Sequence, residues 1–228
     1  MAETGDEQRT AVAPDGSPVE VYRRLPAGRE PELVHGAIAG GAAVLELGCG
    51  TGRLTRELAA LGHAVTAIDN EPAMLAEIAG VPGIEPVEAD LLTLDLGRRF
   101  PAVVLASHFV NTPPPDGDAF LRTVARHLAG DGVALIEAYP PGLDWTGGIG
   151  RRTEIGPVGI TLESAAIDGD SIEAVVVYDV DGRVWRQPFA ATLLDEAGIR
   201  RRLEAAGLAF VRWLDEATGW FLAVRAGL

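Results

Sequence analysis

Residues 44–52 read Val-Leu-Glu-Leu-Gly-Cys-Gly-Thr-Gly, and this stretch decides the fold. Its mostly apolar start predicts a buried strand, and the leucines of residues 53–61 recur at helical spacing. A strand that leads through a glycine-rich turn into a helix is typical of a ligand site, because glycine accepts the turn and lets a ligand approach. The free N–H groups at the start of the helix favour negative charge on that ligand.

The pattern around this stretch alternates between the periods of strands and helices. Short apolar runs predict five strands, at residues 42–47, 64–68, 84–89, 102–107 and 133–138. Amphipathic segments predict helices at residues 53–61, 72–78 and 118–128, the last of them stopped by Gly130-Asp131-Gly132. Strands that alternate with helices indicate an α/β fold with a mainly parallel sheet.

The periodicity changes after the fifth strand. Three successive strands are predicted at residues 157–166, 171–180 and 183–191, with Asp-Gly turns between them and no helix. These strands therefore form an antiparallel insertion. The pattern ends with a helix at 195–206 and two antiparallel strands at 208–214 and 219–225.

Three regions follow from these patterns. Residues 1–16 are polar and acidic, and we expect them to be flexible. Residues 17–41 predict two short helices, the first begun by Pro18, which form a candidate lid. Residues 42–228 form the main domain, and we expect its insertion at 157–191 to cap the substrate pocket.

The composition limits the partners that the protein can have. The formal net charge is −14, and the basic residues are all arginines that form no basic stripe, which argues against a nucleic-acid substrate. The single cysteine, Cys49, cannot form an intrachain disulfide and suits a reducing cytoplasm. No apolar run reaches the roughly 18 residues of a membrane span. We expect a cytoplasmic monomer or homodimer that acts on a small molecule.

Three ligands suit the glycine turn: a dinucleotide, a mononucleotide phosphate and S-adenosylmethionine. The dinucleotide fingerprint needs a third glycine where this chain has Arg53, and the phosphate-loop sequence Gly-Lys-Ser/Thr is absent. Glu46 is a poor neighbour for pyrophosphate but can face the ammonium group of an amino-acid-bearing cofactor. Asp69 ends the second strand, where a carboxylate takes ribose hydroxyls, and Asp90 follows the third, within reach of an adenine amine.

Three segments resemble the first three motifs of the class I S-adenosylmethionine-dependent methyltransferases. They are Val-Leu-Glu-Leu-Gly-Cys-Gly-Thr-Gly at 44–52, Val-Thr-Ala-Ile-Asp at 65–69 and Glu-Ala-Asp at 88–90. The resemblance covers roughly residues 40–140 together with the terminal helix and hairpin. It implies a Rossmann-like sheet of seven strands in the order 3-2-1-4-5-7-6, with strand 7 antiparallel, and S-adenosylmethionine as the methyl donor.

The resemblance also implies roles for individual residues. Glu46 would reach the cofactor's ammonium group through water, and Asp69 would hold the ribose. The other residues assigned to the cofactor are Gly48, Gly50 and Gly52 at its methionine part, Asn70, Met74, Asp90 and Leu91 around its adenine, and Ser107. Each acid also has a structural explanation: Asp69 can cap the helix that follows it, and Asp90 can be an ordinary loop acid.

The reacting residues are expected directly after strands four and five, because ligands of an open parallel sheet bind outside the carboxyl ends of its strands. His108 is the first candidate for a general base, since the ordinary pKa of histidine lies near neutral pH. Glu137, at the end of the fifth strand, is the second candidate. A structural histidine and a buried hydrogen-bond partner are the alternatives for these two residues.

Aromatic and polar residues near the same edge are candidates for substrate binding: Tyr22, His35, Phe109, Asn111, Tyr139 and Trp145. Core packing is the alternative for Phe109, a turn cap for Asn111, and a solvated helix face for Tyr22. The sequence has no cluster of histidines, cysteines or paired acids at metal-ligand spacing, so we expect no metal.

The function expected from these observations is methyl transfer to an oxygen, nitrogen or carbon atom of a small organic molecule. An enzyme of this fold can also use bound S-adenosylmethionine without transferring its methyl group, as a cyclase or pericyclase would. A third alternative is a non-catalytic cofactor-binding partner. The residues of the cofactor site do not separate these three functions.

Overall fold

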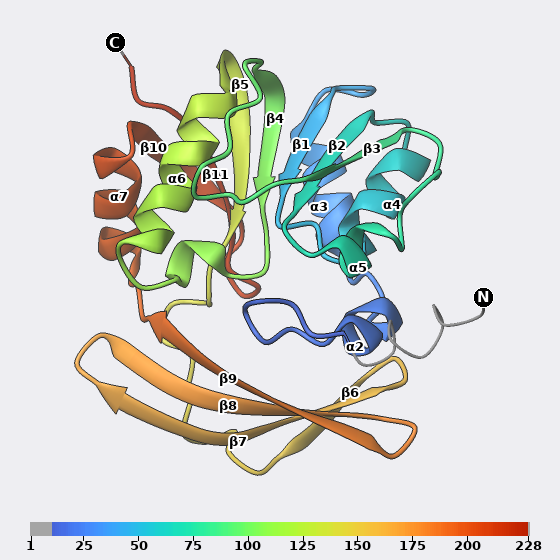
Figure 1. Ribbon diagram of the computed structural model, residues 1–228. Coiled ribbons are helices and arrows are strands. Elements are labelled where there is room, and N and C mark those ends of the chain that lie inside the picture. The colour runs from blue at the N-terminus through green and yellow to red at the C-terminus, as the bar shows by residue number, and fades with distance from the viewer. Residues whose placement is uncertain (1–10, 228) are drawn as a thin grey trace.

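The computed structural model describes residues 11–227 and consists of an α/β body above a smaller antiparallel sheet (Figure 1). The body contains seven strands in the order β10-β11-β5-β4-β1-β2-β3. Strands β1 to β5 run parallel, whereas β11 is antiparallel to both β5 and β10. This confirms the predicted order and the antiparallel seventh strand. The strands of the body are β1 (Val44–Leu47), β2 (Val65–Asp69), β3 (Ile84–Glu88), β4 (Phe100–Leu105), β5 (Leu128–Glu137), β10 (Leu208–Asp215) and β11 (Trp220–Arg225).

Helices cover both faces of this sheet, and the central strand β1 is therefore buried on both sides. Leu45 and Leu47 pack towards α6 and α7, while Val44 points to the opposite face, towards α3 and α4. Side chains of a strand alternate between faces, so burial on both faces gives the continuous apolar run of the sequence. The helices are α2 (Val19–Arg24), α3 (Glu30–Ala37), α4 (Arg53–Ala60), α5 (Pro72–Leu75), the 3-10 turn η1 (Phe109–Asn111), α6 (Asp116–His127) and α7 (Glu196–Ala205).

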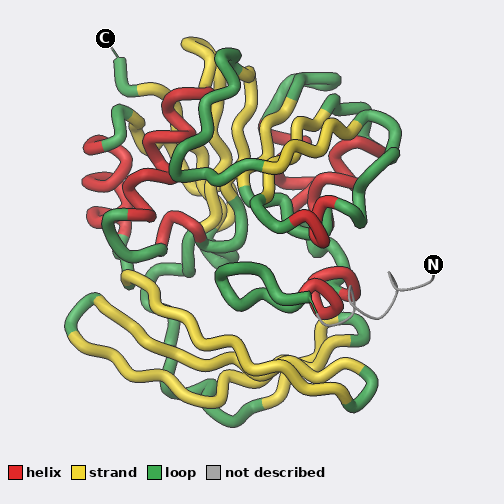
Figure 2. The backbone as a smooth tube through the Cα atoms, in the orientation of Figure 1, coloured by secondary structure: helices red, strands yellow, loops and turns green. Residues whose placement is uncertain are grey.

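The second sheet lies below the carboxyl ends of the body's parallel strands (Figure 2). Its four antiparallel strands are ordered β6-β7-β8-β9, and we call it the cap. They are β6 (Arg152–Ile155), β7 (Val158–Asp168), β8 (Ser171–Val180) and β9 (Arg183–Thr192). Three of these strands were predicted, but β6 was missed because all four of its residues are exposed and show no apolar alternation.

The predicted turn at residues 130–132 is wrong. Helix α6 ends at His127, and β5 begins directly at Leu128, so the two glycines lie inside the strand. Leu128 is fully buried and pairs with Phe100 of β4. A side chain at Gly132 would come within 2.9 Å of the main-chain oxygen of Pro101, so this glycine marks a close approach of two strands.

Residues 11–16 are not the loose segment that was expected, and residues 1–10 lie outside the described residues. Val12 and Pro18 form a β-bridge, and the Ala13 N–H donates to the Ser17 carbonyl at 2.9 Å. Ala13 packs on the buried side chain of Met74. The segment, Ala-Val-Ala-Pro-Asp-Gly, is therefore held by both hydrogen bonds and apolar contact, and its apolar start sets it apart from the polar residues before it.

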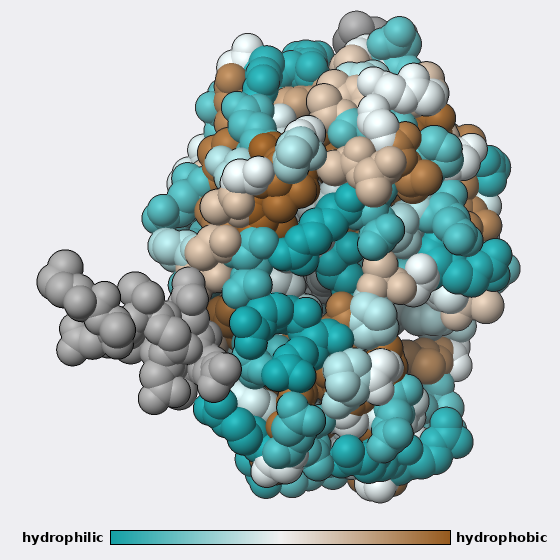
Figure 3. Space-filling model, turned by 90° about the vertical axis from the view of Figure 1, so that its right-hand side faces the viewer, coloured by the Kyte–Doolittle hydropathy of each residue, from teal (hydrophilic) through white to brown (hydrophobic). Residues whose placement is uncertain are grey.

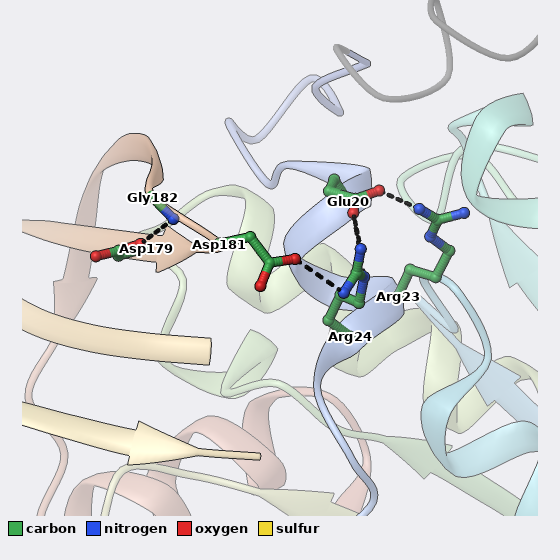
Figure 4. Close-up of polar contacts among 6 residues, drawn as sticks. All are labelled: Glu20, Arg23, Arg24, Asp179, Asp181 and Gly182. Carbon is green, nitrogen blue, oxygen red and sulfur yellow. Dashed lines mark hydrogen bonds and ion pairs between the residues drawn. The ribbon is translucent and has the colours of Figure 1, made fainter. Parts of the chain in front are cut away.

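Helix α2 is tied to the tip of the β8–β9 hairpin by a cluster of charges (Figure 4). The buried carboxylate of Glu20 accepts hydrogen bonds from Arg23 and Arg24. Arg24 also lies 3.3 Å from Asp181, while Asp179 accepts the Gly182 N–H at 3.1 Å and shapes the hairpin. The charges join the candidate lid to the cap.

The helices between residues 11 and 227 are short, and the longest, α6, has 12 residues. No helix in this range combines the length and the apolar character that a bilayer span requires. In the face shown in Figure 3, hydrophilic residues dominate and apolar residues form separate patches.

We expect Glu20 and Asp181, the two acids that pair with Arg24, to differ in their contribution to stability. Glu20→Ala should lower the free energy of unfolding by about 1–3 kcal/mol, because it removes a buried charged acceptor of two hydrogen bonds. Asp181→Asn should change it by less than about 0.5 kcal/mol, because an exposed ion pair contributes little. Urea unfolding of both variants measures the difference, and equal losses would contradict this account.

Candidate active site

The glycine turn joins the carboxyl end of β1 to the start of α4. Its three glycines have positive φ angles of 74° at Gly48, 55° at Gly50 and 78° at Gly52, which side chains rarely adopt. A Cβ atom at Gly48 would collide with the ring of Phe109, and one at Gly52 would collide with Ile78. At Gly50 it would meet nothing closer than the Met74 sulfur at 4.0 Å. Two glycines are therefore required by internal packing, and Gly50 leaves open space for a ligand.

Asp69 holds this turn from the end of β2. One carboxylate oxygen accepts the Gly50 N–H at 2.8 Å and the other accepts the Glu71 N–H at 3.0 Å. Partial burial raises the pKa of Asp69 despite these two bonds. The cap of α5 is Glu71, whose side chain accepts the Ala73 N–H, so Asp69 shapes the turn rather than capping that helix. Asn70 beside it is exposed.

Glu46 lies beneath the turn and is 2% exposed. Its carboxylate accepts a hydrogen bond from the Thr55 hydroxyl at 2.6 Å. Burial raises the pKa of Glu46 to about 7, although Thr55 and the positive charge of Arg53 oppose that rise. The carboxylate is thus poised between its two protonation states at neutral pH.

Arg53 is the cation of the site, and the sequence interpretation treated it only as a missing glycine. Its guanidinium lies 2.7 Å from a carboxylate oxygen of Glu30, which comes from α3. The same positive charge lowers the pKa of Glu46, Glu137 and His108. The sequence held one signal for this network. It is an arginine in the first helical turn after the glycine loop, with a threonine two residues later.

Asp90 lies in a turn after β3. It is exposed, and its carboxylate accepts the Leu92 N–H at 2.8 Å. The neighbouring Leu91 is buried, and its carbonyl accepts the Thr123 hydroxyl at 2.8 Å. This turn is a sufficient structural reason for Asp90, so its contact with an adenine stays a prediction.

The reacting residues were expected directly after β4 and β5, and we call this part of the molecule the reacting edge. Ser107 and His108 both adopt left-handed backbone angles, with φ of 55° and 59°. The Ser107 N–H donates to a carboxylate oxygen of Glu137 at 2.7 Å, and the His108 Nε2 atom lies 3.8 Å from the other oxygen. The His108 ring stacks on Tyr139 with a centroid distance of 4.0 Å, and Trp145 meets Tyr139 edge-on at 4.7 Å.

Burial shifts the pKa values at this edge in opposite directions. It lowers the pKa of His108 to about 4, with help from the positive charge of Arg53. It raises the pKa of Glu137 to about 7, against the hydrogen bond from Ser107 and the charge of Arg53. At neutral pH the imidazole is therefore neutral, and the carboxyl group is the one that titrates.

The other substrate candidates are placed differently. His35 is not brought to this edge, because its Nδ1 atom lies 2.9 Å from His63, whose other nitrogen contacts the Ala42 carbonyl at 3.0 Å. Phe109 covers Gly48 and packs in the core, as its structural alternative predicted. Tyr22 contacts Tyr178 of the cap edge-on, with 6.4 Å between the rings. Asn111 is buried, and its bonds are described below.

Comparisons with known proteins agree with this geometry. Residues 44–132 match a family model described as a methyltransferase domain. The chain is 30% identical over 179 residues to the cypemycin N-terminal methyltransferase from a Streptomyces species, covering 74% of this chain and 73% of that protein.

The chain belongs to the class I S-adenosylmethionine-dependent methyltransferases.

Solved methyltransferase structures share the fold. The CcbJ methyltransferase from Streptomyces caelestis superposes with a TM-score of 0.69 at 21% identity, covering 89% of this chain and 91% of that one. The sugar N-methyltransferase KedS8 from a Streptoalloteichus species gives 0.65 at 24% identity, covering 86% and 85%. Among residues 11–227 of this methyltransferase, no group of three acidic, histidine or cysteine side chains is placed to hold a metal.

The residues around the glycine turn fit the methyltransferase cofactor. The amino-acid part of S-adenosylmethionine carries both an ammonium and a carboxylate group, and the site offers the Glu46 carboxylate and the Arg53 guanidinium. Gly50 leaves space beside the turn, whereas the neighbouring Met74 is buried against Ala13 and Val19. The donor set therefore suits the zwitterionic amino-acid part of the cofactor.

We expect Glu46→Gln to make the methyltransferase more stable at high pH while weakening its cofactor binding. The folded pKa of Glu46 lies above its ordinary value of 4.5, so this residue favours folding below pH 4.5 and loses that contribution as the pH rises through about 7. At pH 8.5 the variant should gain about 1–3 kcal/mol in the free energy of unfolding, a gain that disappears near pH 4.

Urea unfolding across this pH range measures the stability, and calorimetry with S-adenosylhomocysteine measures the binding. Glu85→Gln is the matched control, because Arg98 lowers the pKa of this exposed residue and the pH trend should have the opposite sign. A Glu46 variant that is no more stable than the native protein at pH 8.5 would refute the prediction.

Proposed function

We propose that this methyltransferase methylates an amine nitrogen of a small natural product in the cytoplasm. The observation that carries the proposal is the pair of Glu137, which is buried, and His108, which is partly exposed, 3.8 Å apart at the reacting edge. An amine is protonated in water at neutral pH and must lose a proton before its lone pair can attack. A buried carboxylate beside a neutral imidazole offers a place for that proton.

Two relatives support nitrogen as the acceptor atom. One is named for methylation of the N-terminus of cypemycin, and the other for methylation of a sugar nitrogen. The net charge of −14 also favours the approach of a cationic amine. An oxygen or carbon acceptor has no comparable support from the charges of this site.

Each part of the chain has a defined task in this proposal. The cofactor, when bound, supplies an electrophilic methyl group on a sulfonium. Glu46 and Arg53 would hold its amino-acid part, Asp69 fixes the turn and would hold the ribose, and Met74 would lie on the adenine side. The cap, strands β6 to β9, together with Tyr22, Tyr139 and Trp145, encloses the acceptor and excludes water. Orientation of this kind supplies much of the rate of a methyl transfer.

In this proposal the proton of the amine passes to a side chain at the reacting edge. We assign its acceptance to Glu137, because the pKa of His108 near 4 makes the imidazole a weak base. His108 is held flat against Tyr139 and presents a neutral nitrogen towards Glu137. Its role is to position the acceptor and to keep the carboxylate in place.

The proposal is tested with a panel of acceptors and S-adenosylmethionine. The panel pairs peptides that have a free N-terminus with their acetylated forms, and amino sugars with the corresponding hydroxyl sugars. We expect S-adenosylhomocysteine and a product heavier by one methyl group only with the free amines. Turnover of a hydroxyl or acetylated partner would refute amine methylation, and an altered product without S-adenosylhomocysteine would indicate a non-methylating reaction.

Turnover should rise with pH until Glu137 is deprotonated. The native rate is expected to increase through about pH 7 and then level off, because the carboxylate is the active form. Glu137→Gln should lower kcat by about 10²–10⁴-fold and remove this inflection. His108→Ala should lower kcat less and keep the inflection, with cofactor affinity near normal. An inflection that persists in Glu137→Gln would exclude Glu137 as the base.

A further inference from the structure

One side chain contacts both connections between the body and the cap. The chain leaves the body after β5, at Tyr139, and returns to it after β9, at Thr192. Asn111, in the turn after β4, accepts the Tyr139 N–H on its amide oxygen at 2.9 Å. Its amide nitrogen donates to the Thr192 carbonyl at 2.8 Å. The two bonds also define which way the amide points.

The backbone that carries Asn111 is itself fixed. Arg202 of α7 donates to the carbonyls on either side of it, that of Val110 at 2.8 Å and that of Thr112 at 3.0 Å. Asp118 of α6 binds the same guanidinium at 3.0 Å. Asn111 is 1% exposed, so its amide bonds do not exchange readily with water.

The contacts of Asn111 lead directly to the reacting edge. Tyr139, whose N–H it binds, stacks on His108 and meets Trp145. Thr192 ends β9, which also carries Phe189, and the Phe189 ring lies 6.4 Å from that of Tyr139. A shift of the cap would therefore move the aromatic wall relative to the base.

We propose that Asn111 is a positioning residue that fixes the cap on the body and so sets where the acceptor lies relative to Glu137 and His108. The kinetic part of this inference rests on the proposed function. The positioning role replaces the two roles considered from the sequence, a substrate contact and a turn cap. Both ends of the Asn111 amide bind other segments of the chain.

Asn111→Asp separates this role from general loss of stability. The protonated acid can donate to the Thr192 carbonyl and accept from the Tyr139 N–H, as the amide does, whereas the ionised acid has no donor. Burial raises the pKa of such a carboxyl group. We expect the kcat/KM of Asn111→Asp to be close to that of the native protein at pH 6. At pH 9 it should be at least tenfold below the native value.

Asn111→Leu removes both bonds and keeps the shape, so its loss of kcat/KM should be tenfold or more at every pH, with unchanged affinity for S-adenosylhomocysteine. The matched control is Arg225→Met, because Arg225 also donates to two main-chain carbonyls, those of Ala125 and Leu128, at the opposite edge of the sheet. The control should keep kcat/KM within twofold. A flat pH ratio for Asn111→Asp, or equal losses in Asn111→Leu and Arg225→Met, would overturn the proposal.

Hydrogen exchange tests the same inference without an acceptor. Amides of residues 139–145 and 190–195 should lose protection in Asn111→Leu and keep it in Arg225→Met. If the native protein turns over no amine, the proposed function fails, while this measurement still decides the role of Asn111. Unchanged protection at both connections would exclude it.

Discussion

Burial of two carboxyl groups, Glu46 and Glu137, is the constraint that the rest of the site offsets, and one guanidinium acts on both. Glu46 and Glu137 are almost fully buried, and a carboxylate removed from water without a partner is unfavourable by several kcal/mol. Arg53 lowers the pKa of both, and it is itself paired with Glu30. Arg53 is the first residue of α4, and helical side chains tilt towards the N-terminus, the end at which the glycine turn lies. The residue that breaks the dinucleotide fingerprint therefore also supplies a positive charge that, together with the hydrogen bonds from Thr55 and Ser107, partly offsets the burial of both acids.

The glycine motif has two physical meanings in this fold. Gly48 and Gly52 make room for Phe109 and Ile78, so they let the turn pack against its own domain. Gly50 has open space beside it and is bound by Asp69 through its N–H. The spacing of the motif thus combines a packing requirement with a ligand requirement. A comparison of glycines alone would not separate the two.

The strands of the body were predictable because both of their faces are buried, which leaves continuous apolar runs such as Val44–Leu47. Strand β6 has no buried face, so it left no pattern. Residue pairs that meet only through the tertiary fold were also missed, among them Thr55 with Glu46 and His35 with His63. Periodicity indicates which face a residue occupies, but it does not indicate which side chain that residue meets. His35 was therefore assigned to the wrong surroundings.

The reactive residues and the cap are linked by the geometry of an insertion. An insertion after β5 must leave and return at the carboxyl edge of the sheet, where the ligands of parallel α/β folds bind. Its first and last residues therefore necessarily adjoin the reacting edge, which explains why Tyr139 and Thr192 flank one asparagine from the β4 turn. The inner face of the cap can then vary with the acceptor, while the cofactor turn stays on β1 and β2. Under the proposed function, acceptor choice and cofactor binding are separated in the chain, and the buried amide of Asn111 is one of the contacts that fix the cap beside the reacting edge.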